Sequence, residues 1–148
     1  MVLYNRYVRP PFLEQLRGAW STSGSFLCVG LDPDIEHVRK CVPNSDRPVF
    51  EFCREIIDLT ADLVCAFKPQ IAFFSSCGAE DDLRALISYV HAEYPGIPVL
   101  LDAKRGDIGS TAEQYAKEAF DRYNADAVTV NPYLGWESIE PYRRYGGR

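Results

Sequence analysis

Three charged residues at the end of one strand are the part of this sequence best suited to chemistry. An apolar run at 97–101 leads directly into Asp102 and Lys104, and Asp107 follows after Gly106. Because side chains alternate along a strand, Asp102 and Lys104 are expected on one face. Neighbouring carboxylates keep a lysine cationic, so Lys104 is suited to donate a proton rather than to act as a Schiff-base nucleophile. The trio therefore suits a reaction that forms a carbanion and then protonates it.

The same trio allows two other interpretations. Asp102 and Asp107 could bind a divalent metal together, or the three residues could form a structural ion pair at a strand end. Charges on a buried strand face are costly unless they pair or do chemistry. The buried run before Asp102 therefore favours a functional site over a structural one.

Alternating strands and helices are predicted to position these residues. We predict strands over 25–31, 64–67, 97–101 and 127–130, and helices over 11–20, 48–63, 79–94, 111–124 and 136–145. The stretch 35–47 is predicted as a polar linker. Apolar strands that alternate with amphipathic helices indicate an α/β fold with a parallel sheet covered by helices.

Polar residues follow these strands, among them Asp32, Lys68 and Asn131. The carboxyl edge of the strands is the catalytic face of a (β/α)8 barrel and the ligand crevice of an open doubly wound sheet. No GxGxxG follows the first strand, so a dinucleotide-binding fold lacks its fingerprint. A barrel takes about 250 residues, and four βα units in 148 residues are close to half of one.

The composition of the chain argues against some classes of binding partner. The net charge of −5 argues against a nucleic-acid surface, and no apolar run is long enough to span a membrane. We expect a cytosolic protein. The five cysteines include no CxxC pair and are expected to be reduced thiols, mostly packed as small hydrophobic residues. The two histidines, His37 and His91, lie far apart in the chain, so a histidine metal site is not predicted, and both are expected on the surface or in loops.

One motif gives a specific resemblance. The run 102–111, Asp-Ala-Lys-Arg-Gly-Asp-Ile-Gly-Ser-Thr, resembles the DxKxxDIxxT signature of the orotidine 5′-phosphate decarboxylase family. Gly-Leu-Asp at 30–32 and Phe-Lys-Pro at 67–69 match the first two strand ends of that family in the same order. Together with Val-Asn-Pro-Tyr-Leu-Gly at 130–135, the motif resembles the longer bacterial-type branch. The fold implied by this resemblance is a (β/α)8 TIM barrel.

The resemblance implies the conversion of orotidine 5′-phosphate to UMP in de novo pyrimidine biosynthesis, without a cofactor or metal. Lys104 would protonate a carbanion at C6 of the pyrimidine. Asp102 would lie near the departing carboxylate and hold Lys104. Asp107 would act in the active site of the partner subunit of a homodimer.

The remaining site residues implied by the resemblance bind the nucleotide. Asp32 and Lys68 would bind ribose hydroxyls, and Ile108 and Thr111 would accompany Asp107 in the partner's site. The implied partners are therefore the nucleotide substrate and a second copy of the chain, with no nucleic acid and no membrane.

The sequence spans only about the first four βα units, so 1–148 is expected to be the N-terminal portion of a single TIM-barrel decarboxylase domain whose C-terminal half is absent. The residues that grip the phosphate in this family cannot be assigned. We expect this chain alone to be a poor catalyst and to associate through its open sheet edges. The alternatives are a related sugar-phosphate decarboxylase or epimerase with a metal on Asp102 and Asp107, and a non-catalytic half barrel.

Overall fold

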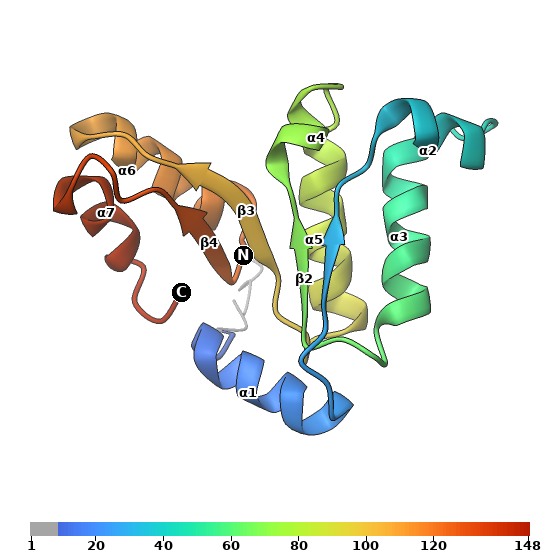
Figure 1. The fold of residues 1–148 in the computed structure, drawn as a ribbon, viewed down its shortest axis with the longest axis horizontal. Coiled ribbons are helices and arrows are strands. Elements are labelled where there is room, and N and C mark those ends of the chain that lie inside the picture. The colour runs from blue at the N-terminus through green and yellow to red at the C-terminus, as the bar shows by residue number, and fades with distance from the viewer. Residues whose placement is uncertain (1–8) are drawn as a thin grey trace, which may run out of the picture.

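Strands and helices alternate along the chain in this computed structural model, which describes residues 9–148 (Figure 1). The elements in chain order are α1 (Phe12–Ser23), β1 (Cys28–Leu31), α2 (Ile35–Cys41), α3 (Pro48–Thr60), β2 (Ala66–Pro69), α4 (Ile71–Ser75), α5 (Glu80–Glu93), β3 (Leu100–Arg105), α6 (Gly109–Lys117), the π-helical turn η1 (Glu118–Arg122), β4 (Ala127–Val130), the 3-10 turn η2 (Trp136–Ser138) and α7 (Glu140–Arg143). The four predicted strands are confirmed, with ends that shift by a few residues.

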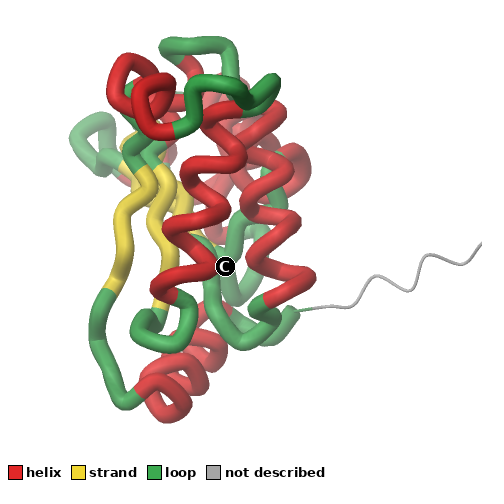
Figure 2. Tube along the Cα trace, turned by 90° about the vertical axis from the view of Figure 1, so that its right-hand side faces the viewer, coloured by secondary structure: helices red, strands yellow, loops and turns green. Residues whose placement is uncertain are grey.

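The four strands run parallel in the order in which they occur in the sequence. β1 pairs with β2, and β3 pairs with β4. Two single bridges, Phe67 with Val99 and Gln70 with Asp102, join β2 to β3. The helices that follow the strands stand on one side of them (Figure 2). This arrangement is that of consecutive βα units of a (β/α)8 barrel, which confirms the predicted fold class.

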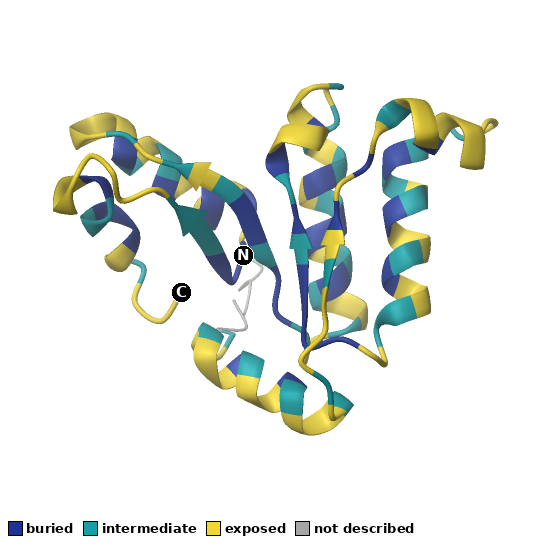
Figure 3. Cartoon of the chain, viewed as in Figure 1, coloured by how far each residue is buried: buried dark blue, intermediate teal, exposed yellow. Residues whose placement is uncertain are grey.

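The core lies between the strands and the helices that cover them (Figure 3). α3 shows why these segments fold as helices. Pro48 suits the first helical turn, and Val49, Cys53 and Ile57 follow at four-residue spacing and are all buried. α5 likewise buries Leu83 and its apolar neighbours one turn further on. The carboxyl ends of the strands are thereby held on a packed layer.

The prediction of a polar linker over 35–47 is wrong, because α2 occupies part of it. The carboxylate of Asp34 accepts a hydrogen bond from the backbone amide of His37 at 2.9 Å and so caps the helix. Val38 is fully buried and anchors the helix on the core. The helix predicted over 136–145 is instead two short turns, and the helix after β3 ends in the π-helical turn η1.

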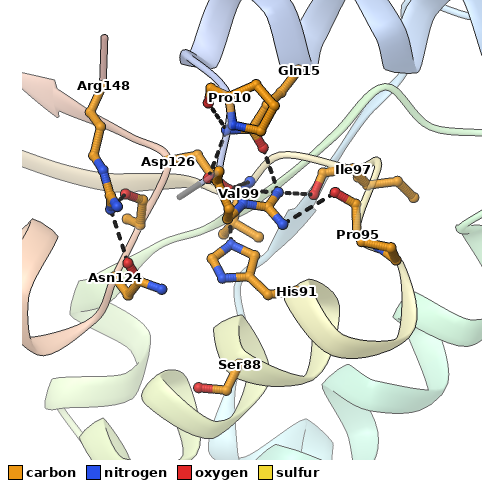
Figure 4. Close-up of polar contacts among 12 residues, drawn as sticks. Pro10, Gln15, Ser88, His91, Pro95, Ile97, Val99, Asn124, Asp126 and Arg148 are labelled. Carbon is orange, nitrogen blue, oxygen red and sulfur yellow. Dashed lines mark hydrogen bonds and ion pairs between the residues drawn. The ribbon is translucent and has the colours of Figure 1, made fainter. Parts of the chain in front are cut away.

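A buried polar cluster around Asp126 lies at the opposite end of the strands from the predicted site (Figure 4). Asp126 is 1% exposed and precedes β4. Its carboxylate accepts hydrogen bonds from Arg9 Nε at 2.7 Å, Gln15 Nε2 at 3.0 Å and the Val99 amide at 2.9 Å, and it contacts His91 Nε2 at 2.9 Å. The cluster fastens the segment before α1, and α1 itself, to the sheet. The expectation of a surface or loop position for His91 is therefore wrong, because it lies in α5 with its side chain 12% exposed.

The cysteines differ in their environments. All five are free thiols, as expected, but only Cys53 and Cys65 are buried, and Cys28 and Cys41 are exposed. Cys77 is partly buried and packs against the core, so three of the five pack as hydrophobic residues, as expected. Within residues 9–148, no helix combines the length and the apolar character that crossing a membrane requires.

Candidate functional site

The candidate site lies at the carboxyl ends of the four strands. Parallel pairing brings these ends to one edge, so residues far apart in the sequence meet there. β2 contributes Lys68 and the following Gln70, β3 contributes Asp102 and Lys104, and β4 contributes Thr129. All of their polar side chains converge on the carboxylate of Asp102.

Asp102 is the centre of this array and is only 5% exposed. The ammonium group of Lys104 lies 2.6 Å from both of its carboxylate oxygens. Lys68 Nζ and Gln70 Nε2 donate to Oδ2 at 3.2 Å and 3.0 Å. The hydroxyl of Thr129 donates to Oδ1 at 2.7 Å. One buried carboxylate thus faces two cations and two neutral donors.

These donors control the protonation of Asp102. Burial by itself would raise the pKa of the carboxyl group. Hydrogen bonds from Lys104, Thr129 and Lys68 outweigh burial and lower the pKa of Asp102 to about 2. The carboxylate is therefore ionised at neutral pH, and its charge is balanced by the two lysines.

Lys104 has both a partner and access to solvent. Its side chain is 65% exposed although its ammonium group contacts Asp102. Its backbone has a φ of 48°, in the left-handed region that non-glycine residues rarely adopt. Such backbone strain persists only where the surrounding structure enforces it, and it is common at functional sites. The regular strand alternation that predicted the position of Lys104 therefore breaks at Lys104 itself.

On the helix-covered side, Arg105 fastens this end of β3. Its guanidinium group donates two hydrogen bonds to Glu118 Oε2, at 3.1 Å and 3.0 Å, and lies 4.6 Å from the ring centroid of Tyr115. Glu118 opens the π-helical turn η1. These contacts tie the residue next to Lys104 to the helix that follows it.

The other predicted site residues surround this array without joining it. Asp32 is exposed just beyond β1. Asp107 accepts a hydrogen bond from the Ile108 amide at 2.8 Å, and no ion pair of Asp107 occurs among residues 9–148. Ile108 is 53% exposed, and Thr111 is also exposed. A single chain therefore joins Lys68, Asp102 and Lys104 but leaves the loop after β3 free to face outward.

Two residues of the array, Gln70 and Thr129, were not predicted from the sequence. Gln70 follows Lys68 by two positions, so strand alternation could have placed it on the same face. Thr129 is the one polar residue of the otherwise apolar β4. Asn131, which was singled out, instead caps a turn by accepting a hydrogen bond from the Tyr133 amide at 3.0 Å.

A metal would have to compete for the candidate ligands. In the part of the chain that the structure describes, no group of three or more His, Cys, Asp or Glu side chains is placed to hold one. Asp102 already contacts two ammonium groups. A metal at Asp102 would therefore have to displace an ammonium group.

Comparison with known proteins gives consistent matches. The model of the family described as "Orotidine 5'-phosphate decarboxylase / HUMPS family" matches residues 25–148. Orotidine 5'-phosphate decarboxylases from Ralstonia nicotianae and Cupriavidus necator are 64% and 61% identical to this chain, over 88% and 93% of its length. Those alignments cover 48% and 50% of the relatives, so the chain spans about half of their length.

Solved structures match in the same way. The Leishmania donovani OMP decarboxylase shares 38% identity at a TM-score of 0.74, over 93% of this chain and 51% of the other. A Streptomyces avermitilis structure titled as a candidate of the same activity shares 34% identity at a TM-score of 0.79, over 99% of this chain and 53% of that one.

Proposed function

Because this chain belongs to the orotidine 5′-phosphate decarboxylase / HUMPS family, we propose that the protein containing it converts orotidine 5′-phosphate to UMP in de novo pyrimidine biosynthesis. The observation that carries the proposal is the ammonium group of Lys104, held 2.6 Å from the buried carboxylate of Asp102 at the open end of the strands. The proposal includes a cytosolic location and places 1–148 as the N-terminal portion of a single barrel domain.

In this reaction the bond between C6 of the pyrimidine and its carboxylate breaks. Carbon dioxide leaves, and the electron pair stays on C6. The ammonium group of Lys104 then supplies the proton that forms the new C–H bond, and solvent restores the proton on Lys104. Asp102 holds Lys104 in place and keeps a fixed negative charge beside the departing carboxylate. Charges that are already oriented stabilise the developing carbanion without a reorganisation cost.

Two residues at the carboxyl ends of the strands are proposed to bind the ribose. Asp32 follows β1 and is free to accept hydrogen bonds from sugar hydroxyls. Lys68 is one-third exposed, and so its ammonium group can donate to a hydroxyl while it remains near Asp102 at 3.2 Å. The residues that bind the phosphate are not assigned to this chain.

A homodimer with shared active sites is the second part of the proposal. Asp107, Ile108 and Thr111 lie on the segment that leaves β3, and Asp107 makes no ion pair with Lys104 within residues 9–148. The exposure of Ile108 suits a surface that a second copy covers. In the dimer, Asp107 of each subunit enters the site that holds the Lys104 of the other.

We expect a full-length fusion to be active. Residues 1–148 would be joined to the second half of the Ralstonia nicotianae relative, and carbon dioxide release from orotidine 5′-phosphate would be measured. Turnover should continue in the presence of a chelator, because the proposed chemistry uses no metal. A folded fusion without turnover would contradict the proposal, and turnover that a chelator abolishes would support the metal-dependent alternative.

Mixed dimers test the shared site. The variants Lys104→Ala and Asp107→Ala should each be nearly inactive in the fusion. An equimolar mixture, unfolded and refolded together, should recover about a quarter of the wild-type rate, because half of the dimers hold one intact site out of two. A mixture that stays as inactive as its components, with dimers confirmed by sedimentation, would argue that Asp107 acts within its own subunit.

A further inference from the structure

The pairing of β3 with β4 is irregular at the catalytic residues. Leu101 pairs with Val128 and Arg105 pairs with Val130, so three residues of β3 lie opposite the single residue Thr129 of β4. A bulge of this kind leaves backbone amides without partners in the ladder and turns side chains in a new direction. Lys104 lies in this bulge, with its backbone φ of 48°.

The hydroxyl group of Thr129 fills the gap in the ladder. It accepts hydrogen bonds from the backbone amides of Ala103 and Lys104, each at 3.0 Å. It donates its proton to Asp102 Oδ1 at 2.7 Å. A hydroxyl offers one donor and two acceptor positions, so all three are used. One oxygen atom thus connects the backbone of Lys104 to the carboxylate that holds its ammonium group.

A valine would suit β4 equally well by strand propensity, because its neighbours Val128 and Val130 are valines. A methyl group at this position would leave the two amides of Ala103 and Lys104 without partners and would remove a donor from Asp102. The hydroxyl of Thr129 is therefore needed to bond the amides of the bulge, whereas strand propensity alone does not require it.

We propose that Thr129 is a positioning residue for the decarboxylation, and that its hydroxyl holds Lys104 in the left-handed conformation that directs the ammonium group to both oxygens of Asp102. This proposal rests on the proposed function in one respect, which is that Lys104 donates the proton. The coupling of Thr129 to the geometry of Asp102 and Lys104 does not depend on the substrate.

Replacing Thr129 should affect the chemical step more than binding. A displacement of a reacting group by about 1 Å can cost about 100-fold in rate. We expect Thr129→Val to lower kcat of the fusion by about 10-fold to 100-fold with little change in KM. Thr129→Ser keeps the hydroxyl and should stay within a few-fold of wild type. Thr60→Val is the matched control, since it removes a hydroxyl that bonds only the Ile56 carbonyl in α3, at 2.7 Å.

A second readout separates this inference from the proposed function. Carbon-13 NMR titration of the Asp102 carboxyl group, in the fusion without substrate, reports its hydrogen bonds directly. Thr129→Val should raise the pKa of Asp102 from about 2 toward its ordinary value, whereas Thr129→Ser and Thr60→Val should leave it unchanged. Thr129→Ala, with its smaller side chain, serves in its place if Thr129→Val does not fold.

The outcomes are distinct. Loss of kcat with a raised pKa of Asp102, both reversed by serine, supports the positioning role. A folded valine variant with unchanged kcat and unchanged Asp102 titration overturns it. If wild-type fusion does not decarboxylate the nucleotide, the proposed function fails, while the titration still decides whether Thr129 holds the array.

Discussion

Replacing Lys104 with alanine should lower kcat of the full-length fusion by at least about 1,000-fold, the largest effect expected of any single change in this chain. The substitution removes the proton donor itself. It also removes the positive charge that faces the carbanion as it forms. Decarboxylation of orotidine 5′-phosphate at saturating substrate measures the effect, and KM should change far less than kcat because Lys104 acts on the reacting atoms.

A loss of folding stability should not account for this loss of activity. Asp102 would keep Lys68, Gln70 and Thr129 as donors, each within 3.2 Å. The remaining contacts still compensate its buried charge, so the variant is expected to fold. Lys117→Ala is the matched control, because Lys117 is an exposed lysine in the last turn of α6, away from the array. Near-normal turnover by Lys104→Ala would remove Lys104 from the mechanism.

The charged strand end at 102–107 was predictable because it rests on two robust signals, an apolar strand and charges placed directly after it. Strand alternation predicted that Asp102 and Lys104 lie near each other, although the backbone of Lys104 departs from that alternation. The backbone conformation of Lys104 was not predictable, because it depends on a bulge that only the pairing with β4 reveals. The role of Thr129 is hidden for the same reason.

Other differences from the sequence predictions have similarly local causes. Composition alone made 35–47 resemble a linker, whereas Asp34 caps a helix that begins there and Val38 is buried in the core. His91 looked like a surface residue because its partner Asp126 is 35 positions away. Hydrophobic periodicity in the sequence predicts strands and helices. It does not predict polar contacts between distant elements, because these form only when the fold brings the elements together.

Those distant contacts make Asp126 the second residue with a large expected effect. Its carboxylate is 1% exposed and faces Arg9, Gln15 and His91 as well as the Val99 amide. Asp126→Asn would leave the guanidinium group of Arg9, itself 10% exposed, without a counter-ion. Breaking a buried ion pair by removing one partner costs about 3–5 kcal/mol, and we expect a loss of that size in the free energy of unfolding in urea at neutral pH.

The pH dependence of this loss of stability shows whether the charge of Asp126 causes it. Burial would raise the pKa of Asp126, but His91, the Val99 amide and Arg9 outweigh burial and lower it from 3.8 to about 2. Between these values the unfolded chain binds more protons than the folded one, so the contribution of Asp126 is complete above about pH 4 and is lost as pH falls toward 2. This shift in the pKa of Asp126 corresponds to about 2 kcal/mol in the free energy of unfolding.

Urea unfolding of wild type and Asp126→Asn at several pH values between 7 and 2 should therefore show a difference in unfolding free energy that narrows by about 2 kcal/mol as pH falls below about 4. Asp81→Asn is the matched control, since Asp81 pairs with Arg84 at the surface and its side chain is 84% exposed. An exposed pair contributes at most about 1 kcal/mol, so that variant should follow wild type throughout. A constant gap between wild type and Asp126→Asn down to pH 2 would mean that the asparagine disturbs packing, and that the charge of Asp126 does not hold α1 against the sheet.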